Sequence, residues 1–224
     1  MVSAAAKRLK AVQRKRARDV DSTPSWQQPV AIKQRSVTVV KGSNFIYEST
    51  IPFNVCEGIV DFYYNNDNYK THEGSHSGGQ KDSDIKESVD LSCNVDYGEF
   101  DSRIDQYFQH LDRQLKVYFN KFERSHMPCK VTDKFNIQWY PPGGGYKVWH
   151  FERTEKRHSV KRHLVWMTYL TDNPDGGTEF LYQDLYVPAE KGKTLIWPAE
   201  WTHTHRSRPD TKYEKMIITG WVEL

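Results

Sequence analysis

The sequence predicts an α+β protein that is mainly β, in which N-terminal helices pack on a C-terminal double-stranded β-helix, or jelly roll. Two observations support this fold class: helical periodicity before Pro128, and a series of short β-rich runs separated by glycine or proline turns after it. The 224 residues, 37% hydrophobic and 13% aromatic, can bury one sizeable core. We therefore expect helices that cover one antiparallel sandwich.

The N-terminal part of the chain differs in composition from the rest. Residues 1–18 hold seven lysines and arginines and no acidic residue, although the formal charge of the whole chain is only +3. Residues 19–34 contain two prolines and little periodicity, which is typical of a linker. We therefore expect a basic tail and linker over 1–34 and one domain over 35–224. The tail is interpreted as a solvated extension, with nucleic-acid or lipid contact, a nuclear address or a transit peptide as alternatives.

Two further features of the composition narrow the class of protein. The sequence has no apolar run of some 18 residues, and its N-terminus is charged where a signal peptide would be apolar, so we expect a cytoplasmic protein without membrane insertion. The three cysteines, Cys56, Cys93 and Cys129, are widely spaced and form no CxxC pair. This pattern argues against a disulfide framework and against a zinc knuckle.

Before Pro128 the sequence predicts one short strand and two helices. The strand covers 36–40, and a helix covers 52–65 with a proline at its start. A polar, glycine-rich loop is expected over 65–81. The clearest helical stripe follows near residue 101, with apolar residues at three- and four-residue steps: Ile104, Tyr107, Phe108, Leu111, Leu115, Tyr118, Phe119 and Phe122.

After Pro128 the pattern predicts the jelly-roll core, over about 130–224. Seven β-rich runs are separated by glycine or proline turns, and we see no internal repeat. The expected strands are 134–140, 146–152, 162–170, 178–187, 193–197, 202–207 and 213–222.

Polar residues on three of these strands indicate a site. His150 and Glu152 are two apart on one predicted strand, so both side chains would point to the same face. Taken alone, the pair is better explained as a surface salt bridge. However, His203 and His205 lie on a later strand, and Lys215 lies among apolar residues of another, where burial is costly unless the cation meets an anion.

Two histidines and a carboxylate are the ligand set of non-haem Fe(II) oxygenases, which leaves open positions on the metal. A cation ten residues after the second histidine would suit the far carboxylate of a dicarboxylate. A zinc-holding or metal-free interaction module is the alternative from a different class, but it leaves Lys215 unexplained.

These residues resemble the motif of the Fe(II)- and 2-oxoglutarate-dependent dioxygenases, in particular their prolyl 4-hydroxylase-like branch. That motif runs His-x-Asp/Glu, a distal His, a Lys or Arg ten residues later and a Trp six residues after that. His150, Glu152, His205, Lys215 and Trp221 follow this order, and Pro209 matches the branch's His-x-x-x-Pro. The Pro and Lys spacings select His205 over His203.

Further segments are similar to the same family. They are "RHLVWMTYL", "GGTEF", in which Gly176 and Gly177 would make a turn before Thr178, and "KGKTLIWP". Two residues depart from the family's pattern. Glu152 stands where many relatives have Asp, and Tyr146 lies four residues before the histidine rather than three. Either Tyr140 or Tyr146 would contact 2-oxoglutarate, and we prefer Tyr140.

The resemblance implies an enzyme that binds Fe(II) through His150, Glu152 and His205. Lys215, with Tyr140 and Thr178, would bind 2-oxoglutarate. With O2, and with ascorbate as an optional addition, it would hydroxylate a C–H bond and release succinate and CO2. The implied substrate is a prolyl residue in a peptide or protein, or a free amino acid. A nucleic acid bound through residues 1–18 is the alternative substrate.

Overall fold

In the computed structural model of the protein, residues 44–76, 79–94 and 101–224 are described. The tail and linker expected over 1–34, and the strand expected over 36–40, lie outside the described residues. Among the residues that the structure describes, no helix combines the length and the apolar character needed to span a membrane.

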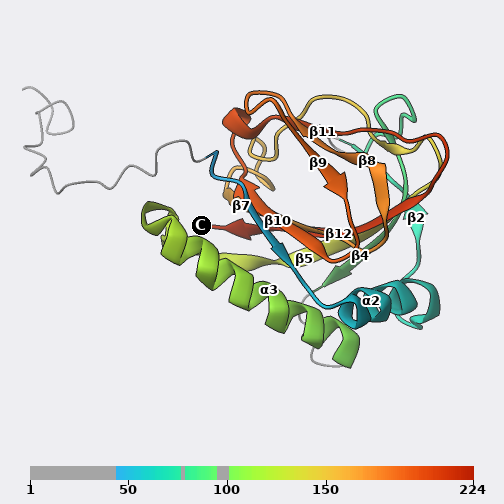
Figure 1. The fold of residues 1–224 in the computed structure, drawn as a ribbon, viewed down its shortest axis with the longest axis horizontal. Helices are drawn as coiled ribbons and strands as arrows, with labels where there is room; N and C mark the ends of the chain where they lie inside the picture. Colours follow the sequence, from blue (N-terminus) through green and yellow to red (C-terminus); the bar gives the residue numbers. More distant parts are fainter. Residues whose placement is uncertain (1–43, 77–78, 95–100) are drawn as a thin grey trace, which may run out of the picture. The chain divides into compact units, whose positions relative to one another are not determined.

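A seven-stranded antiparallel sheet forms the main layer (Figure 1). A three-stranded sheet faces it, and a two-stranded ribbon pairs β3 (Lys86–Glu87) with β6 (Gly145–Tyr146). In spatial order, the large sheet consists of β1 (Tyr47–Thr50), β10 (Lys193–Pro198), β7 (Arg162–Tyr169), β12 (Lys215–Glu223), β5 (Lys130–Tyr140), β4 (Val89–Asn94) and β2 (His72–Glu73). The smaller sheet consists of β11 (His205–Ser207), β8 (Asn173–Phe180) and β9 (Leu185–Ala189).

Two helices cover the outer face of the large sheet, α2 (Phe53–Asn65) and α3 (Ser102–Lys121) (Figure 1). Asp101 caps α3 by accepting a hydrogen bond from the Arg103 backbone N–H, as its position before the stripe predicts. The apolar stripe of α3 packs into a cluster with α2 and with outward-facing residues of the sheet, including Trp166. The mainly β fold with covering helices is therefore confirmed.

Strand alternation separates two cores. On β7, Leu164 and Trp166 pack toward the helices, whereas Val165 and Met167 belong to the cluster between the sheets. Gly220 on β12 permits this packing, because a Cβ there would lie 2.4 Å from the Trp166 ring. The inner face is the face that carries the site, since Val165 and Met167 of this face line its cavity.

The structure corrects several sequence-based boundaries. Residues 146–152 do not form a strand: β6 ends at Tyr146, and only an isolated bridge between His150 and His205 follows. The run expected over 178–187 is two strands, β8 and β9, and the run expected over 202–207 begins as a 3-10 turn, η4 (Trp201–His203). Strands β1, β2 and β4 were missed, and they extend the large sheet with residues from before Pro128.

Candidate functional site

Backbone hydrogen bonds hold His150 and Glu152 at the inner face of the sandwich. They join these residues to His205 and to Ala199. The His150 N–H donates to the His205 carbonyl at 3.0 Å, and the reciprocal bond is 2.9 Å. The Glu152 N–H donates to the Ala199 carbonyl at 3.1 Å. The expectation that both side chains face the same side therefore holds, although the strand geometry that motivated it is absent.

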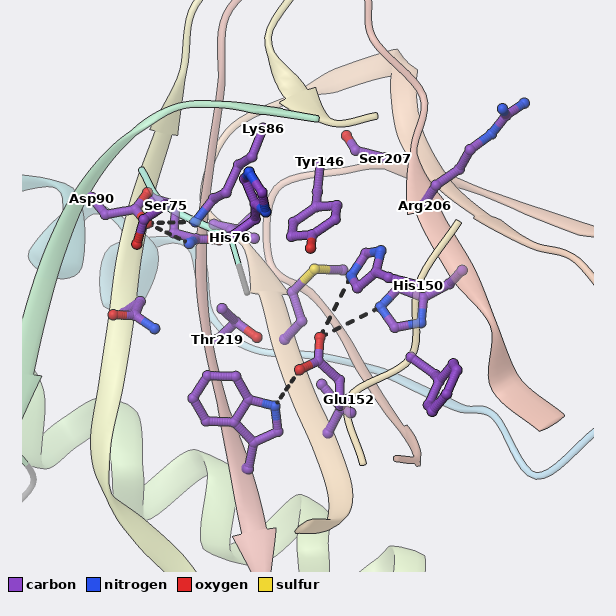
Figure 2. Close-up of a pocket in the computed structure, with 18 of the residues that line it drawn as sticks. Ser75, His76, Lys86, Asp90, Tyr146, His150, Glu152, Arg206, Ser207 and Thr219 are labelled. Atoms are coloured by element: carbon purple, nitrogen blue, oxygen red, sulfur yellow. Dashed lines mark hydrogen bonds and ion pairs between the residues drawn. The ribbon is translucent and has the colours of Figure 1, made fainter. Parts of the chain in front are cut away.

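Three ligand-type atoms converge at this point. The Oε1 atom of Glu152 lies 3.5 Å from His150 Nε2 and 3.9 Å from His205 Nε2. Within the described part of the chain, these three residues form the His/Cys/Asp/Glu cluster compact enough to hold a metal ion. Figure 2 shows His150 and Glu152 meeting in the pocket.

Hydrogen bonds of the imidazoles leave the correct nitrogens available. The Nδ1 atom of His150 is 3.0 Å from the Val148 carbonyl, and that of His205 is 2.8 Å from the His203 carbonyl. Because a carbonyl only accepts, each Nδ1 carries a proton, so in the neutral ring Nε2, which faces Glu152, is the nitrogen with the lone pair. This donor set fits a divalent metal bound by two neutral imidazoles and one carboxylate oxygen.

Electrostatics favour the protonation states that a metal needs. Burial alone would raise the pKa of the Glu152 carboxyl, but His150, Arg162 and His205 together hold that pKa well below its usual range. Burial, with the neighbouring His150, lowers the pKa of His205 to about 3. The carboxylate is therefore ionised and the buried imidazole neutral at neutral pH.

His203 does not join the cluster, in agreement with the spacings that select His205 over it. It is buried on η4, where its Nε2 lies 2.8 Å from the Asn44 carbonyl and its Nδ1 3.0 Å from Thr202 Oγ1. Its position follows from the 3-10 turn, which replaces the strand on which His203 and His205 would have faced the same side.

Lys215 lies at the opposite end of the same cavity. Its ammonium donates to Ser207 Oγ at 2.7 Å and to the Gly176 carbonyl, and it lies 5.2 Å from the centroid of the Tyr140 ring. Among the residues that the structure describes, no carboxylate forms an ion pair with it. Burial lowers the pKa of Lys215 to about 7, with Asp210 acting in the opposite direction. A bound anion would supply the missing counter-charge.

Tyr140 and Thr178 both line this end of the cavity, whereas Tyr146 does not. Tyr140 pairs with Lys215 in the register of β5 and β12, and its hydroxyl donates to Gln138 Oε1 at 2.7 Å. Thr178 Oγ1 lies 2.6 Å from the Tyr169 hydroxyl. Tyr146 instead stacks on the His150 ring, with 3.8 Å between centroids (Figure 2). The structure thus brings Tyr140, not Tyr146, to the cation.

Gly176 and Gly177 lie within β8 at a register shift and not in a turn before it, which corrects the sequence-based interpretation. A Cβ on Gly177 would lie 2.0 Å from the Val187 carbonyl oxygen, so only glycine fits there. The irregularity allows the Gly176 carbonyl to accept a hydrogen bond from Lys215.

The cavity has a volume of about 380 Å³ and is lined by further residues besides those around the ligand cluster and Lys215. Its wall opposite the triad carries a buried polar network, in which Asp90 accepts hydrogen bonds from Lys86, Ser88 and Gln138. Figure 2 shows Lys86 and Asp90 gathered there with Ser75 and His76. The loop expected over 65–81 and the segment after Glu152 both contribute to the lining.

Sequence reasoning missed four residues that shape the site. They are Arg162, which contacts Glu152; Tyr169, which contacts Thr178; Ser207, which contacts Lys215; and Gln138, which contacts Tyr140. Their positions gave a partial signal, since each lies two residues from a singled-out residue or at the end of a strand in the family-like segments. Their contacts with these partners form only in the folded chain and leave no pattern in the sequence.

The sequence and the fold were compared with known protein families and solved structures. Residues 135–223 match the model of the 2OG-Fe(II) oxygenase superfamily. A search of curated proteins finds no significant match.

Solved structures of prolyl hydroxylases share the fold. A Pseudomonas putida prolyl-4-hydroxylase has 16% identity and a TM-score of 0.58, over 80% of this chain and 91% of that one. A Trichoplax adhaerens prolyl hydroxylase, in complex with a hypoxia-inducible factor peptide fragment, has 14% identity and a TM-score of 0.60 over 81% and 84%. The 2OG complex of a viral collagen prolyl hydroxylase from Paramecium bursaria Chlorella virus-1 has 14% identity and a TM-score of 0.55, over 82% of this chain and 98% of that one.

Proposed function

We propose that the chain is a 2OG-Fe(II) oxygenase that hydroxylates a prolyl residue in a peptide or protein, on the support of the family model matched by residues 135–223 and of the fold shared with prolyl 4-hydroxylases. The enzyme depends on Fe(II) and 2-oxoglutarate. The observation that carries the proposal is the cavity itself, which has a three-ligand cluster at one end and an uncompensated buried cation at the other.

In this proposal, His150, Glu152 and His205 hold the iron, and the two backbone-bonded imidazoles keep their lone pairs oriented toward it. Lys215 binds the distal carboxylate of 2-oxoglutarate. Tyr140 and Thr178 flank that carboxylate. When bound, iron and 2-oxoglutarate would supply, with O2 as the oxidant, the chemistry of C–H hydroxylation: one oxygen atom of O2 goes to the substrate and the other to succinate, and CO2 is released.

The polar wall opposite the triad is the proposed substrate side. Asp90 accepts three hydrogen bonds, and Lys86 is buried with only one hydrogen-bond acceptor, Asp90, among the described residues. An ammonium group carries three donors, so Lys86 retains donors for the carbonyl oxygens of a peptide next to the target residue. Two hydroxylase neighbours carry a peptide or a collagen substrate in their names, which supports this class of substrate over the alternatives.

Mass spectrometry of reacted substrates tests the proposed activity. The protein, reconstituted with Fe(II) under anaerobic conditions and then given 2-oxoglutarate and O2, is incubated with proline-containing peptides, their alanine-substituted counterparts, free amino acids and oligonucleotides. We expect a gain of one oxygen on prolyl peptides only, together with an equal amount of succinate. Succinate formation coupled to another class of substrate would contradict the prolyl assignment, and no 2-oxoglutarate turnover with any substrate would contradict the oxygenase assignment of the site.

A further inference from the structure

The two oxygens of the Glu152 carboxylate have different surroundings. Oε1 faces the two histidines, as described above. Oε2 instead accepts hydrogen bonds from the Arg162 guanidinium at 2.7 Å and from the Trp221 indole N–H at 3.0 Å. One oxygen is therefore directed to the ligand cluster and the other is anchored to protein.

The two anchoring side chains support each other. The Arg162 guanidinium lies 3.6 Å from the centroid of the Trp221 ring, within cation–π distance, and it also donates to the Glu152 backbone carbonyl at 3.2 Å. Arg162 begins β7, and Trp221 lies near the end of the adjacent strand β12, where the two strands are paired. The anchors thus belong to the rigid large sheet, whereas Glu152 lies on an irregular segment.

The geometry explains how this chain accommodates a glutamate where many relatives of the resembled family have aspartate. The glutamate side chain is longer by one carbon–carbon bond of about 1.5 Å. Without a partner for the distal oxygen, the longer chain has more rotamers and can offer both oxygens to a metal. The two donors remove that freedom and leave a single oxygen facing the histidines.

We propose that Arg162 and Trp221 are positioning residues that hold Glu152 as a one-oxygen ligand and tune the site to glutamate rather than aspartate. The inference rests on the proposed role of Glu152 as a metal ligand. An aspartate at this position would have to give up either the anchors or the metal, because its carboxylate is too short to keep both contacts.

A binding cycle with Mn(II) as the probe tests this proposal without turnover. The cycle compares wild type, Glu152→Asp, Trp221→Phe and the double variant, and measures Mn(II) affinity by electron paramagnetic resonance titration. Trp221→Phe keeps an aromatic ring beside Arg162, although a smaller one, and removes the indole N–H. We expect a weakening of about 10-fold for Trp221→Phe and 10- to 100-fold for Glu152→Asp, as for outer-sphere partners of metal ligands.

The diagnostic result is the coupling between the two substitutions. If the anchors set the length, Glu152→Asp costs less in the Trp221→Phe background than in wild type, and the bound Mn(II) spectrum changes in both single variants. Strictly additive costs, or wild-type affinity for Glu152→Asp, would overturn the proposal. Arg162→Lys is the second anchor variant: it keeps the charge but loses the planar donors, and we expect it to weaken Mn(II) binding as well.

Two controls separate this proposal from the proposed function. Arg153→Gln breaks an ion pair of the same 2.7 Å length, with Glu200 on the neighbouring segment, and should leave Mn(II) affinity within about two-fold of wild type. His150→Ala tests the site itself: if it leaves Mn(II) binding intact, the metal assignment fails, whatever the anchors do. Thermal unfolding of each metal-free variant verifies that it is folded.

Discussion

The two ends of the cavity differ in how their charges are balanced. At the ligand cluster, the Glu152 carboxylate is paired with Arg162, and both imidazoles are bonded to backbone carbonyls. At the other end, the Lys215 ammonium is buried with neutral partners, Ser207 and Gly176. The first end is electrostatically complete before any ligand arrives. The second is destabilised until an anion binds, so the two ends should respond oppositely to substitution and to pH.

The largest effect is expected from His205→Ala at the balanced end. Removing a direct ligand should cost more than the 10- to 100-fold that outer-sphere partners cost, so we expect Mn(II) or Fe(II) affinity to fall by more than about 100-fold. His203→Ala is the matched control, because His203 is also a buried histidine of the same segment but bonds Asn44 instead. Equal losses in both variants, measured by metal titration, would contradict the assignment of His205.

Lys215→Met should separate binding from stability at the other end. Charged hydrogen bonds contribute about 1.5–3 kcal/mol, so 2-oxoglutarate affinity of the Mn(II) form should fall by about 10- to 100-fold. The same variant should make the ligand-free protein more stable, because a buried uncompensated cation is replaced by an apolar chain of similar length. Calorimetric titration and chemical denaturation check the two effects. Reduced stability would show that the cation is already compensated.

The pH dependence of stability sharpens the same contrast. Folding lowers the pKa of Lys215 from 10.5 to about 7, so between these values the unfolded state binds more protons than the native state. The stability of the ligand-free protein should therefore rise with pH from about 7 to 10.5, by at most about 1.4 kcal/mol per unit. The Tyr140 ring faces the Lys215 ammonium, and the charge of Asp210 acts to raise the pKa of Lys215. Subtracting the profile of Lys215→Met isolates its contribution, and parallel profiles would exclude it.

The smallest effect is expected from Tyr140→Phe. Its hydroxyl donates to Gln138 in the ligand-free site and in the proposed complex flanks the distal carboxylate, so substitution removes the net gain of about one hydrogen bond on binding, worth about 0.5–1.5 kcal/mol. We expect 2-oxoglutarate affinity to fall by about 2- to 10-fold with metal affinity unchanged. Tyr146→Phe is the control, since Tyr146 stacks on His150 and does not contact Lys215. A larger loss for Tyr146→Phe would reverse the preference between these two tyrosines.

The parts of the molecule that the sequence predicts well are those with strong local patterns. The apolar stripe of α3 and the β-rich runs of β5, β7 and β12 are strong local patterns, and these elements form close to where they are expected. The strands β1, β2 and β4 were missed because they are short or polar and depend on pairing with distant strands. Pairing of that kind leaves no local trace.

The candidate site shows the same division. Motif spacing placed His150, Glu152, His205 and Lys215 in one site, and the structure brings them to one cavity. Spacing failed for the local geometry around them: 146–152 is irregular, and His203 turns away on η4. The contacts of Arg162 with Glu152 and of Ser207 with Lys215 join separate strands, so only the folded chain reveals them.

Strand β12 runs along the cavity from Lys215 to the partner of Glu152, Trp221. Lys215, Ile217, Thr219 and Trp221 alternate along it, and all four line the cavity, so one continuous strand fixes the separation between the cation and the partner of Glu152. At about 3.3 Å per residue, six residues span about 20 Å, and paired strands on both sides prevent the strand from sliding. A five-carbon dicarboxylate, at about 1.5 Å per carbon–carbon bond, is much shorter than this span. The strand therefore fixes the points from which the Lys215 and Trp221 side chains extend, and the reach of these side chains sets the gap left for the cosubstrate.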